Sequence, residues 1–183
     1  MNKLLIIAGR TASGKDALAT RLIQEFGFQK CITTTTREPR PYEKDGVHYH
    51  FLSEREFLCK VESGEFLEHE VNKGNYYGST LSAVIESLKQ ANTCLILDPR
   101  GAINAKAKLK ENGISSVVLY VNESIDTCKS RLLGRTESES AIQEGMRSLE
   151  SDEKDWDKAF SYDIVTKPLD TIENNAKLAL SVI

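Results

Sequence analysis

The sequence lacks the features of several large protein classes. Its 183 residues include four cysteines, Cys31, Cys59, Cys94 and Cys128, and no two of them form a CxxC pair. This spacing argues against a zinc site and against a disulfide framework, and it fits reduced thiols in a cytosolic protein. The net charge is −3 and no block of lysine or arginine is present, so no nucleic-acid-binding surface is expected.

A long apolar segment near the start of the sequence is also missing. The apolar run Leu4–Ala8 follows Met1, Asn2 and Lys3 and ends at Gly9. It is too short for the hydrophobic part of a signal peptide and far too short to span a membrane. We therefore expect a cytoplasmic protein without a membrane segment. The length fits one domain, and 40% hydrophobic and 28% charged residues are ordinary for a globular chain.

Short apolar runs alternate with helical patterns along most of the chain. Runs rich in branched residues predict buried strands, and apolar residues three and four positions apart predict helices. This alternation is typical of an open parallel sheet with helices on both faces. We expect strands at Leu4–Ala8, Thr93–Leu97, Val117–Val121 and Asp163–Thr166, and helices at Lys15–Phe26, Ser79–Ala91, Gly101–Asn112, Glu123–Leu133 and Asp170–Ile183.

Two segments interrupt the alternation. The first contains the run Thr33–Thr36 and then short strand-like pieces near Val47–Phe51, Phe66–Glu70 and Asn75–Tyr77. It also has a capping-box pattern at Ser53-Glu54-Arg55-Glu56, which starts a helix through Glu62. We interpret it as an inserted subdomain. The second, Thr136–Trp156, is highly charged and predicts a mobile helical lid. The single domain then divides into a core of about residues 1–30, 80–130 and 160–183, a subdomain of about 31–79 and a lid of about 131–157.

A phosphate-binding loop lies between the first predicted strand and helix. Its sequence, Gly9-Arg10-Thr11-Ala12-Ser13-Gly14-Lys15, follows the GxxxxGK pattern. The glycines allow a tight turn whose N–H groups, with the positive end of the helix, hold phosphate oxygens. Lys15 adds a charge that reaches the β- and γ-phosphates. The pattern predicts that these residues, together with Asp16, bind ATP.

Asp16 departs from the usual motif, in which a serine or threonine hydroxyl binds Mg²⁺. A carboxylate is also a good ligand for Mg²⁺. An acidic residue in the first helical turn can instead act only by stabilising the helix dipole. The sequence leaves both interpretations open, and our hypothesis is that Asp16 binds Mg²⁺ directly or through water.

A second group of motifs follows the phosphate loop. Arg37 and Arg40 lie three residues apart in a turn-prone segment, and the planar guanidinium suits phosphate. The complete set is Thr33-Thr34-Thr35-Thr36-Arg37-Glu38-Pro39-Arg40-Pro41, Asp45–Phe51, Gly64–Glu68 and Gly74–Ser79. In this order and spacing, over nearly the whole chain, the motifs resemble the guanylate kinase family.

The resemblance implies a fold, a reaction and a set of site residues. The fold is an α/β, P-loop NTPase-type parallel sheet flanked by helices, with an inserted mixed α/β GMP-binding subdomain and a helical lid. The reaction is phosphorylation of GMP, and of dGMP, by ATP with Mg²⁺, in a monomer or homo-oligomer. The GMP phosphate would be held by Arg37, Arg40, Tyr49 and Tyr77, and the guanine by Thr33, Glu68, Ser79 and Asp98.

The chemistry of guanine supports these roles. A carboxylate such as Glu68 accepts hydrogen bonds from N1–H and N2–H, while a hydroxyl of Thr33 or Ser79 donates to O6. Adenine has the opposite pattern on this edge, so a buried carboxylate rejects it. Asp98 follows a predicted buried strand and can read guanine, lie near Mg²⁺ in a Walker-B-like role, or cap the next helix. His48 has no third metal ligand in view and is expected to be structural, as is His50.

Arg131 and Arg135 lie four residues apart on a predicted helix and share a face. The family similarly has two arginines at the start of its lid, which implies contact with the ATP phosphates and neutralisation of charge in the transition state. We expect the catalytic set to be Lys15, Arg37, Arg131 and Arg135.

The sequence differs from the family pattern at two further positions. Gly145 stands where a further lid arginine is usual, and Arg147 lies two residues on, rotated by about 200° on a helix. Thr166 stands where the family has an asparagine near the adenine. These differences leave the adenine contacts and the remaining lid arginine open.

Two alternatives remain. A ribose 1,5-bisphosphate phosphokinase also has a phosphate loop containing GKD, but Glu68, Arg37, Arg40 and Tyr49 favour a guanine nucleotide. A non-catalytic guanylate-kinase-like module would bind protein partners and have a degraded phosphate loop. The intact Gly14 and Lys15 and the lid arginines argue against the module.

Overall fold

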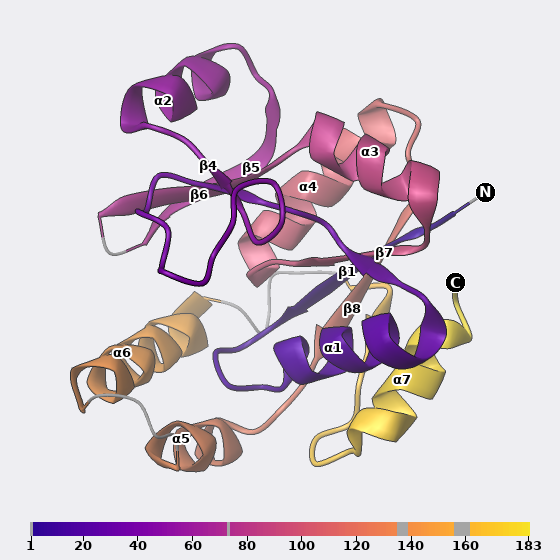
Figure 1. The fold of residues 1–183 in the computed structure, drawn as a ribbon. Helices are drawn as coiled ribbons and strands as arrows, with labels where there is room; N and C mark the ends of the chain where they lie inside the picture. Colours follow the sequence, from indigo (N-terminus) through magenta and orange to yellow (C-terminus); the bar gives the residue numbers. More distant parts are fainter. Residues whose placement is uncertain (1, 73, 135–138, 156–161) are drawn as a thin grey trace.

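A parallel sheet forms the centre of the molecule (Figure 1). The computed structural model describes residues 2–72, 74–134, 139–155 and 162–183. Within them the sheet has the order β2-β7-β1-β8-β9, with β1 at Leu4–Gly9, β2 at Gln29–Lys30, β7 at Thr93–Ile96, β8 at Ser116–Val121 and β9 at Ile164–Val165. All six residues of β1 are buried. The four predicted strands are confirmed, and β2 is an additional edge strand.

Helices cover both faces of this sheet (Figure 1). Alternate side chains of β1 point to opposite faces. Leu5 and Ile7 pack with α1 (Lys15–Phe26) and α7 (Ile172–Leu180), whereas Leu4 and Ile6 pack with α3 (Leu81–Gln90) and α4 (Pro99–Glu111). Each fully buried leucine or isoleucine contributes about 1.5–3 kcal/mol, so this two-sided core fixes the sheet. The expected α/β class is confirmed.

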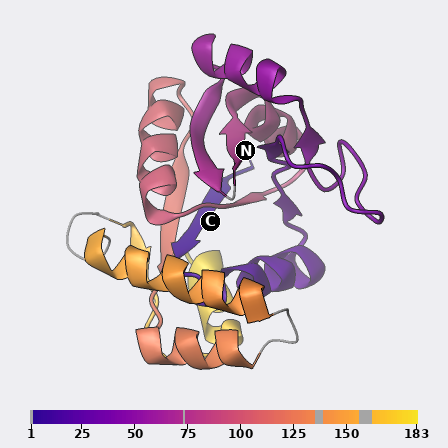
Figure 2. The ribbon, with the colours of Figure 1, turned by 90° about the vertical axis from the view of Figure 1, so that its left-hand side faces the viewer.

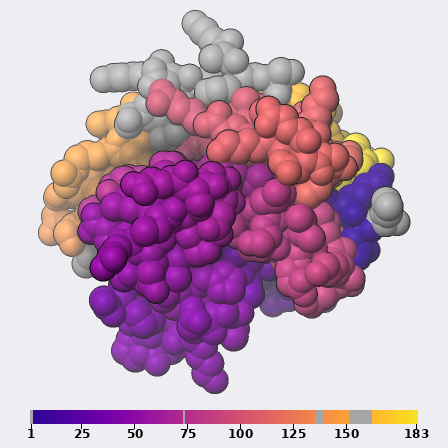
Figure 3. All heavy atoms as spheres, turned by 90° about the horizontal axis from the view of Figure 1, so that it is seen from above, coloured from indigo at the N-terminus to yellow at the C-terminus, as the bar shows by residue number. Residues whose placement is uncertain are grey.

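A second sheet lies beside the first and carries much of the inserted segment (Figure 2). Its order is β4-β3-β6-β5, with β3 at Thr34–Thr35, β4 at His50–Phe51, β5 at Phe66–Asn72 and β6 at Asn75–Thr80. The helix α2 (Glu54–Glu62) begins at the predicted capping box and buries Phe57 against Phe66. Seen from above, this purple segment forms a lobe beside the pink segment of the chain (Figure 3). Antiparallel pairing of β5 with β6 places Glu68 opposite Ser79.

The helices α5 (Ile125–Leu133) and α6 (Glu139–Asp155) pack against each other below the first sheet (Figure 2). Ala12 of the phosphate loop packs against their shared apolar cluster. At Gly145, a Cβ atom would lie 2.9 Å from Leu132 Cδ2, which is too close for an ordinary contact. A side chain at this position would therefore require Leu132 of α5 to shift.

Four predicted helix starts were wrong because polar residues cap the helices at other positions. Ser79 belongs to β6, and α3 begins after the N-cap Thr80. The helix α4 begins at Pro99, before the predicted Gly101. The other two begin after the N-caps Ser124 and Thr171. Among the described helices, none combines the length and apolar character needed to cross a bilayer.

Candidate active site

The phosphate loop, Gly9–Lys15, is held close to the end of β8. A Cβ atom on Gly9, whose φ is +151°, would lie 2.7 Å from the Val121 carbonyl oxygen, so only glycine fits. Lys15 Nζ donates to the carbonyl oxygens of Gly9 and Arg10, at 2.8 and 2.7 Å. The ammonium group is thus folded over the loop that would receive phosphates.

Two cavities meet at Lys15, which lines both of them. The first cavity has a volume of about 410 Å³ and lies between the phosphate loop, the end of β8 and the turn at residues 166–170. The second cavity has a volume of about 240 Å³. The predicted residues that line the second cavity are Thr33, Tyr49, Glu68, Tyr77, Ser79 and Asp98. This arrangement suits transfer of a group between two molecules bound on either side of Lys15.

Glu68 is a buried carboxyl group of the second cavity. Its burial raises the pKa to about 7, and the nearby charge of Asp98 adds to this shift. Ser79 lies opposite Glu68 on the neighbouring strand and lowers the pKa of Glu68 in part. Among the described residues, the buried Ser79 Oγ has no well-aligned hydrogen-bond partner. An unpaired buried hydroxyl beside a buried carboxyl group suits a ligand that both donates and accepts hydrogen bonds.

Asp98 caps α4. Its Oδ1 accepts a hydrogen bond from the Gly101 N–H at 2.6 Å, as the capping alternative predicts. A Cβ atom on Gly101 would lie 3.3 Å from Glu68 Oε2 and 3.4 Å from Asp98 Oδ1, so both carboxyl groups face this point. Capping uses one oxygen and leaves the second for another partner.

Arg37 is held by a carboxylate for which the sequence suggested no role. Its Nη2 donates to both carboxylate oxygens of Glu43 at 2.9 Å, and the Arg40 N–H donates to Glu43 Oε2 at 2.8 Å. The Arg37 guanidinium lies 5.7 Å from the ring centre of Tyr49, which contacts Tyr77 edge-on. Hydrogen bonding to Arg37 lowers the pKa of the Glu43 carboxyl group. In the sequence, the feature that could have suggested this contact is an acidic residue three positions after Arg40.

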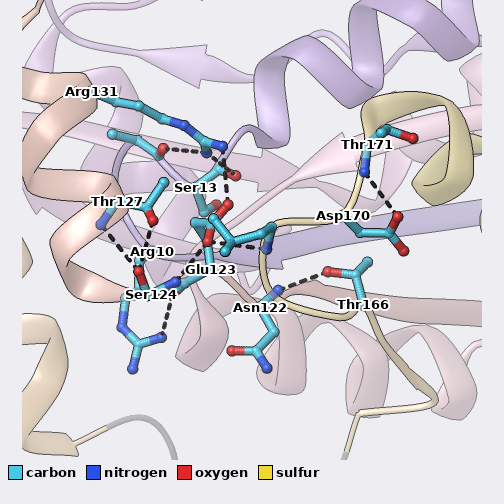
Figure 4. Close-up of polar contacts among 12 residues, drawn as sticks. Arg10, Ser13, Asn122, Glu123, Ser124, Thr127, Arg131, Thr166, Asp170 and Thr171 are labelled. Atoms are coloured by element: carbon cyan, nitrogen blue, oxygen red, sulfur yellow. Dashed lines mark hydrogen bonds and ion pairs between the residues drawn. The ribbon is translucent and has the colours of Figure 1, made fainter.

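Arg131 lines the first cavity and lies against the phosphate loop (Figure 4). Its Nη1 donates to the carbonyl oxygens of Ala12 and Ser13 at 3.2 and 2.9 Å. Arg10 is buried, and its Nη1 donates to the Glu123 carbonyl oxygen at 3.2 Å. Of the other arginines predicted for a lid, Arg135 lies outside the described residues and Arg147 is exposed on α6.

The two predicted metal ligands line different cavities. Asp16 is exposed in the first turn of α1 and lines the first cavity, whereas Asp98 lines the second. In the part of the chain that the structure describes, no three histidine, cysteine or acidic residues cluster as a metal site.

Two further residues discussed from the sequence make structural hydrogen bonds. His48 Nδ1 accepts from the Lys44 N–H at 3.0 Å. Thr166 is buried, and its Oγ1 accepts from the Asn122 N–H at 3.0 Å.

The parallel sheet, the glycine-containing loop after its central strand and the cavities on either side of Lys15 define a P-loop protein. The guanylate kinase family model matches residues 1–181. The guanylate kinase of Clostridium acetobutylicum is 32% identical over 98% of this chain and 84% of its own length. The guanylate kinase of Jannaschia sp. is 34% identical over 97% and 82%. The chain therefore belongs to the guanylate kinase family.

The fold has a solved counterpart in the same family. The crystal structure of guanylate kinase from Anaplasma phagocytophilum superposes with a TM-score of 0.64 and covers 99% of this chain and 84% of its own. The two sequences are 23% identical, so this likeness supports the fold.

Proposed function

We propose that this protein transfers the γ-phosphoryl group of ATP to GMP, and to dGMP, and produces ADP and the diphosphate. The main support is that Lys15 lines both a cavity at the phosphate loop and a second cavity that is also lined by the buried Glu68. ATP binds in the first cavity and GMP in the second. The family membership of the chain supports this assignment.

The roles of the residues follow from this placement. Glu68, Ser79, Thr33 and Asp98 orient guanine, and Arg37, Arg40, Tyr49 and Tyr77 hold its phosphate. An oxygen of that phosphate forms a bond to the γ-phosphorus as the bond to the β,γ-bridging oxygen breaks. The acceptor is an ionised phosphate monoester, so no strong general base is needed. Lys15, Arg37 and Arg131 position the reactants and offset the charge, and Arg135 remains a prediction for the same role.

Mg²⁺ belongs to this proposal as the ion that neutralises charge on the ATP phosphates. The exposed carboxylate of Asp16 at the first cavity is an oxygen donor of the type that Mg²⁺ prefers. Asp98 is the second candidate ligand from the sequence. We propose Asp16, since it lies beside the phosphate loop.

Asp16→Ala is expected to lower kcat by about ten- to a hundredfold and to raise the Mg²⁺ concentration needed for half-maximal rate. The measurement is a Mg²⁺ titration of the initial rate at saturating ATP and GMP. Asp126→Ala, on the exposed side of α5, is the matched control. An unchanged Mg²⁺ dependence in the Asp16 variant would show that this carboxylate acts only on the helix dipole.

The remaining parts of the proposal concern organisation and location. We assign residues of about 31–79 to a GMP-binding subdomain and about 131–157 to a lid, which close over the substrates and exclude water. The four cysteines are unpaired, which supports a reducing compartment such as the cytoplasm.

An acceptor screen tests the proposed function. Purified protein with ATP and Mg²⁺ is expected to phosphorylate GMP and dGMP, with AMP and ribose 1,5-bisphosphate turned over at least a hundredfold less efficiently, because the Glu68 carboxylate rejects adenine. Product formation is measured by chromatography. Turnover of ribose 1,5-bisphosphate without turnover of GMP would overturn the proposal, as would the absence of ATP binding by calorimetry.

A further inference from the structure

Glu123 is a buried acidic residue that the mechanism above does not use. It follows β8 and is 4% exposed. Its Oε2 accepts from Arg131 Nη2 at 3.0 Å, and its Oε1 accepts from the N–H groups of Ser124 at 2.9 Å and Leu169 at 3.3 Å. Both carboxylate oxygens therefore have partners, and these partners come from different parts of the chain (Figure 4).

On one side, Glu123 fixes the guanidinium of Arg131. The ion pair joins a carboxylate that is 5% exposed to a side chain that is 44% exposed. Arg131 also donates to the carbonyl oxygens of Ala12 and Ser13, as described above. Because Arg131 Nη2 donates to Glu123, Arg131 Nη1 points toward the phosphate loop, where the phosphates of ATP would lie.

On the other side, Glu123 holds the turn at residues 166–170. Leu169 adopts φ of +60°, an uncommon value for a residue with a side chain, and its N–H reaches Glu123 Oε1. The neighbouring residue Asn122 donates its N–H to Thr166 Oγ1. Thr166, Lys167 and Asp170 line the first cavity together with residues of the phosphate loop. With phosphates on the loop, the remainder of the nucleotide extends toward this turn.

We propose that Glu123 is a positioning residue of the donor site, which orients Arg131 for phosphoryl transfer and fixes the turn that borders the rest of ATP. This inference rests on the proposed function. The Glu123 carbonyl oxygen also accepts from Arg10, so the same residue joins the phosphate loop, α5 and the turn. Displacing it changes the donor site and leaves the second cavity, where GMP binds, intact.

Glu123→Gln tests this role with almost no change in shape. A carboxylate accepts hydrogen bonds on both oxygens, whereas an amide accepts on one and donates from the other. The glutamine can therefore satisfy Arg131 or the two N–H groups, but not both. We expect kcat to fall about tenfold to a hundredfold and KM for ATP to rise, with KM for GMP within about twofold of wild type. Steady-state kinetics with each substrate varied provides the measurement.

A double-mutant cycle separates positioning from general structural damage. If Glu123 acts on kcat through Arg131, Glu123→Gln should change kcat by less than about twofold in an Arg131→Ala background. Glu173→Gln, which alters an exposed ion pair on α7, is the matched control and should leave all constants unchanged. Thermal melting of each variant shows whether the protein remains folded.

The outcomes distinguish the positioning role of Glu123 from the GMP kinase activity itself. An equal loss of kcat in both backgrounds, or wild-type kinetics for Glu123→Gln, would overturn the positioning role while leaving the GMP kinase activity in place. A wild-type protein without GMP turnover would overturn the proposed function itself. If Glu123→Gln melts early, Glu123→Asp, which keeps two acceptor oxygens, should restore part of the kcat, and its failure to do so would count against the proposal.

Discussion

Replacing Lys15 by methionine is expected to lower kcat by about three orders of magnitude, because a positioned cation beside the transferring group is lost. Lys15 lines both cavities, and its Nζ already lies within 2.8 Å of carbonyl oxygens of the phosphate loop. Methionine keeps the length and apolar stem of the side chain. The expected loss corresponds to about 4 kcal/mol of transition-state stabilisation.

Initial rates at saturating substrates and calorimetric binding of GMP together check this prediction. GMP binding should change little in Lys15→Met, since the guanine and phosphate contacts of the second cavity remain. Lys89→Met, on the exposed face of α3, is the control and should retain wild-type rates. A Lys15 variant that keeps more than about a tenth of wild-type kcat would contradict the placement of phosphoryl transfer between the two cavities.

Glu68→Gln is expected to reduce kcat/KM for GMP by about two to three orders of magnitude, because the amide presents a donor where guanine also presents one. In the wild type, the raised pKa of about 7 means that Glu68 loses its charge as the pH falls below neutrality. KM for GMP should then rise toward lower pH, at most about tenfold per pH unit. The phosphate of GMP also titrates near pH 6, and Glu68→Gln retains that contribution, so it serves as the reference profile.

The same substitution should stabilise the ligand-free protein at high pH. The folded pKa of about 7 lies above the ordinary value of 4.5, so the folded state favours the protonated form. The contribution of Glu68 to stability is therefore most favourable below pH 4.5, falls as the pH rises toward 7, and has lost up to about 3 kcal/mol above that. Glu68→Gln removes this loss, so its melting temperature should exceed that of wild type at pH 8 and approach it at pH 4.5.

Opposite effects on stability and activity are the test of this assignment. Glu86→Gln, on the exposed face of α3, is the control and should leave the difference between pH 4.5 and pH 8 unchanged. A Glu68→Gln protein that melts below wild type at pH 8 would show that the carboxylate is a structural requirement of the second sheet.

The fold was predictable where burial leaves a regular pattern. The strands β1, β7 and β8 are apolar on both faces, and this property is visible in the sequence. Gln29–Lys30 is too short and too exposed to show a hydrophobic periodicity. It forms the strand β2 by pairing with β7. The predicted starts of α3, α4, α5 and α7 were wrong for a different reason. Whether a polar residue caps a helix depends on the direction from which the chain enters.

The candidate site was predictable to the extent that its residues lie in motifs. The structure brings Thr33, Glu68 and Asp98 to one cavity, although Asp98 lies thirty positions after Glu68 in the sequence. Glu43 and Glu123 were not identified because their importance comes from contacts formed on folding. The Leu169 N–H that Glu123 binds is 46 residues away, and no local pattern indicates such a pair.

The pairing of Arg37 Nη2 with both carboxylate oxygens of Glu43 has a consequence for the entropy of acceptor binding. A free arginine side chain has up to about 2 kcal/mol of rotamer entropy to lose when it is immobilised. In this structure the loss occurs on folding, because Glu43 and the ring of Tyr49 already restrict the guanidinium. If Arg37 binds the phosphate of GMP as proposed, that phosphate meets a donor group that is already restricted, and less of the interaction energy is lost to ordering the side chain. Loosening that pair would make the association of GMP more strongly opposed by entropy even where every contact in the bound state is preserved.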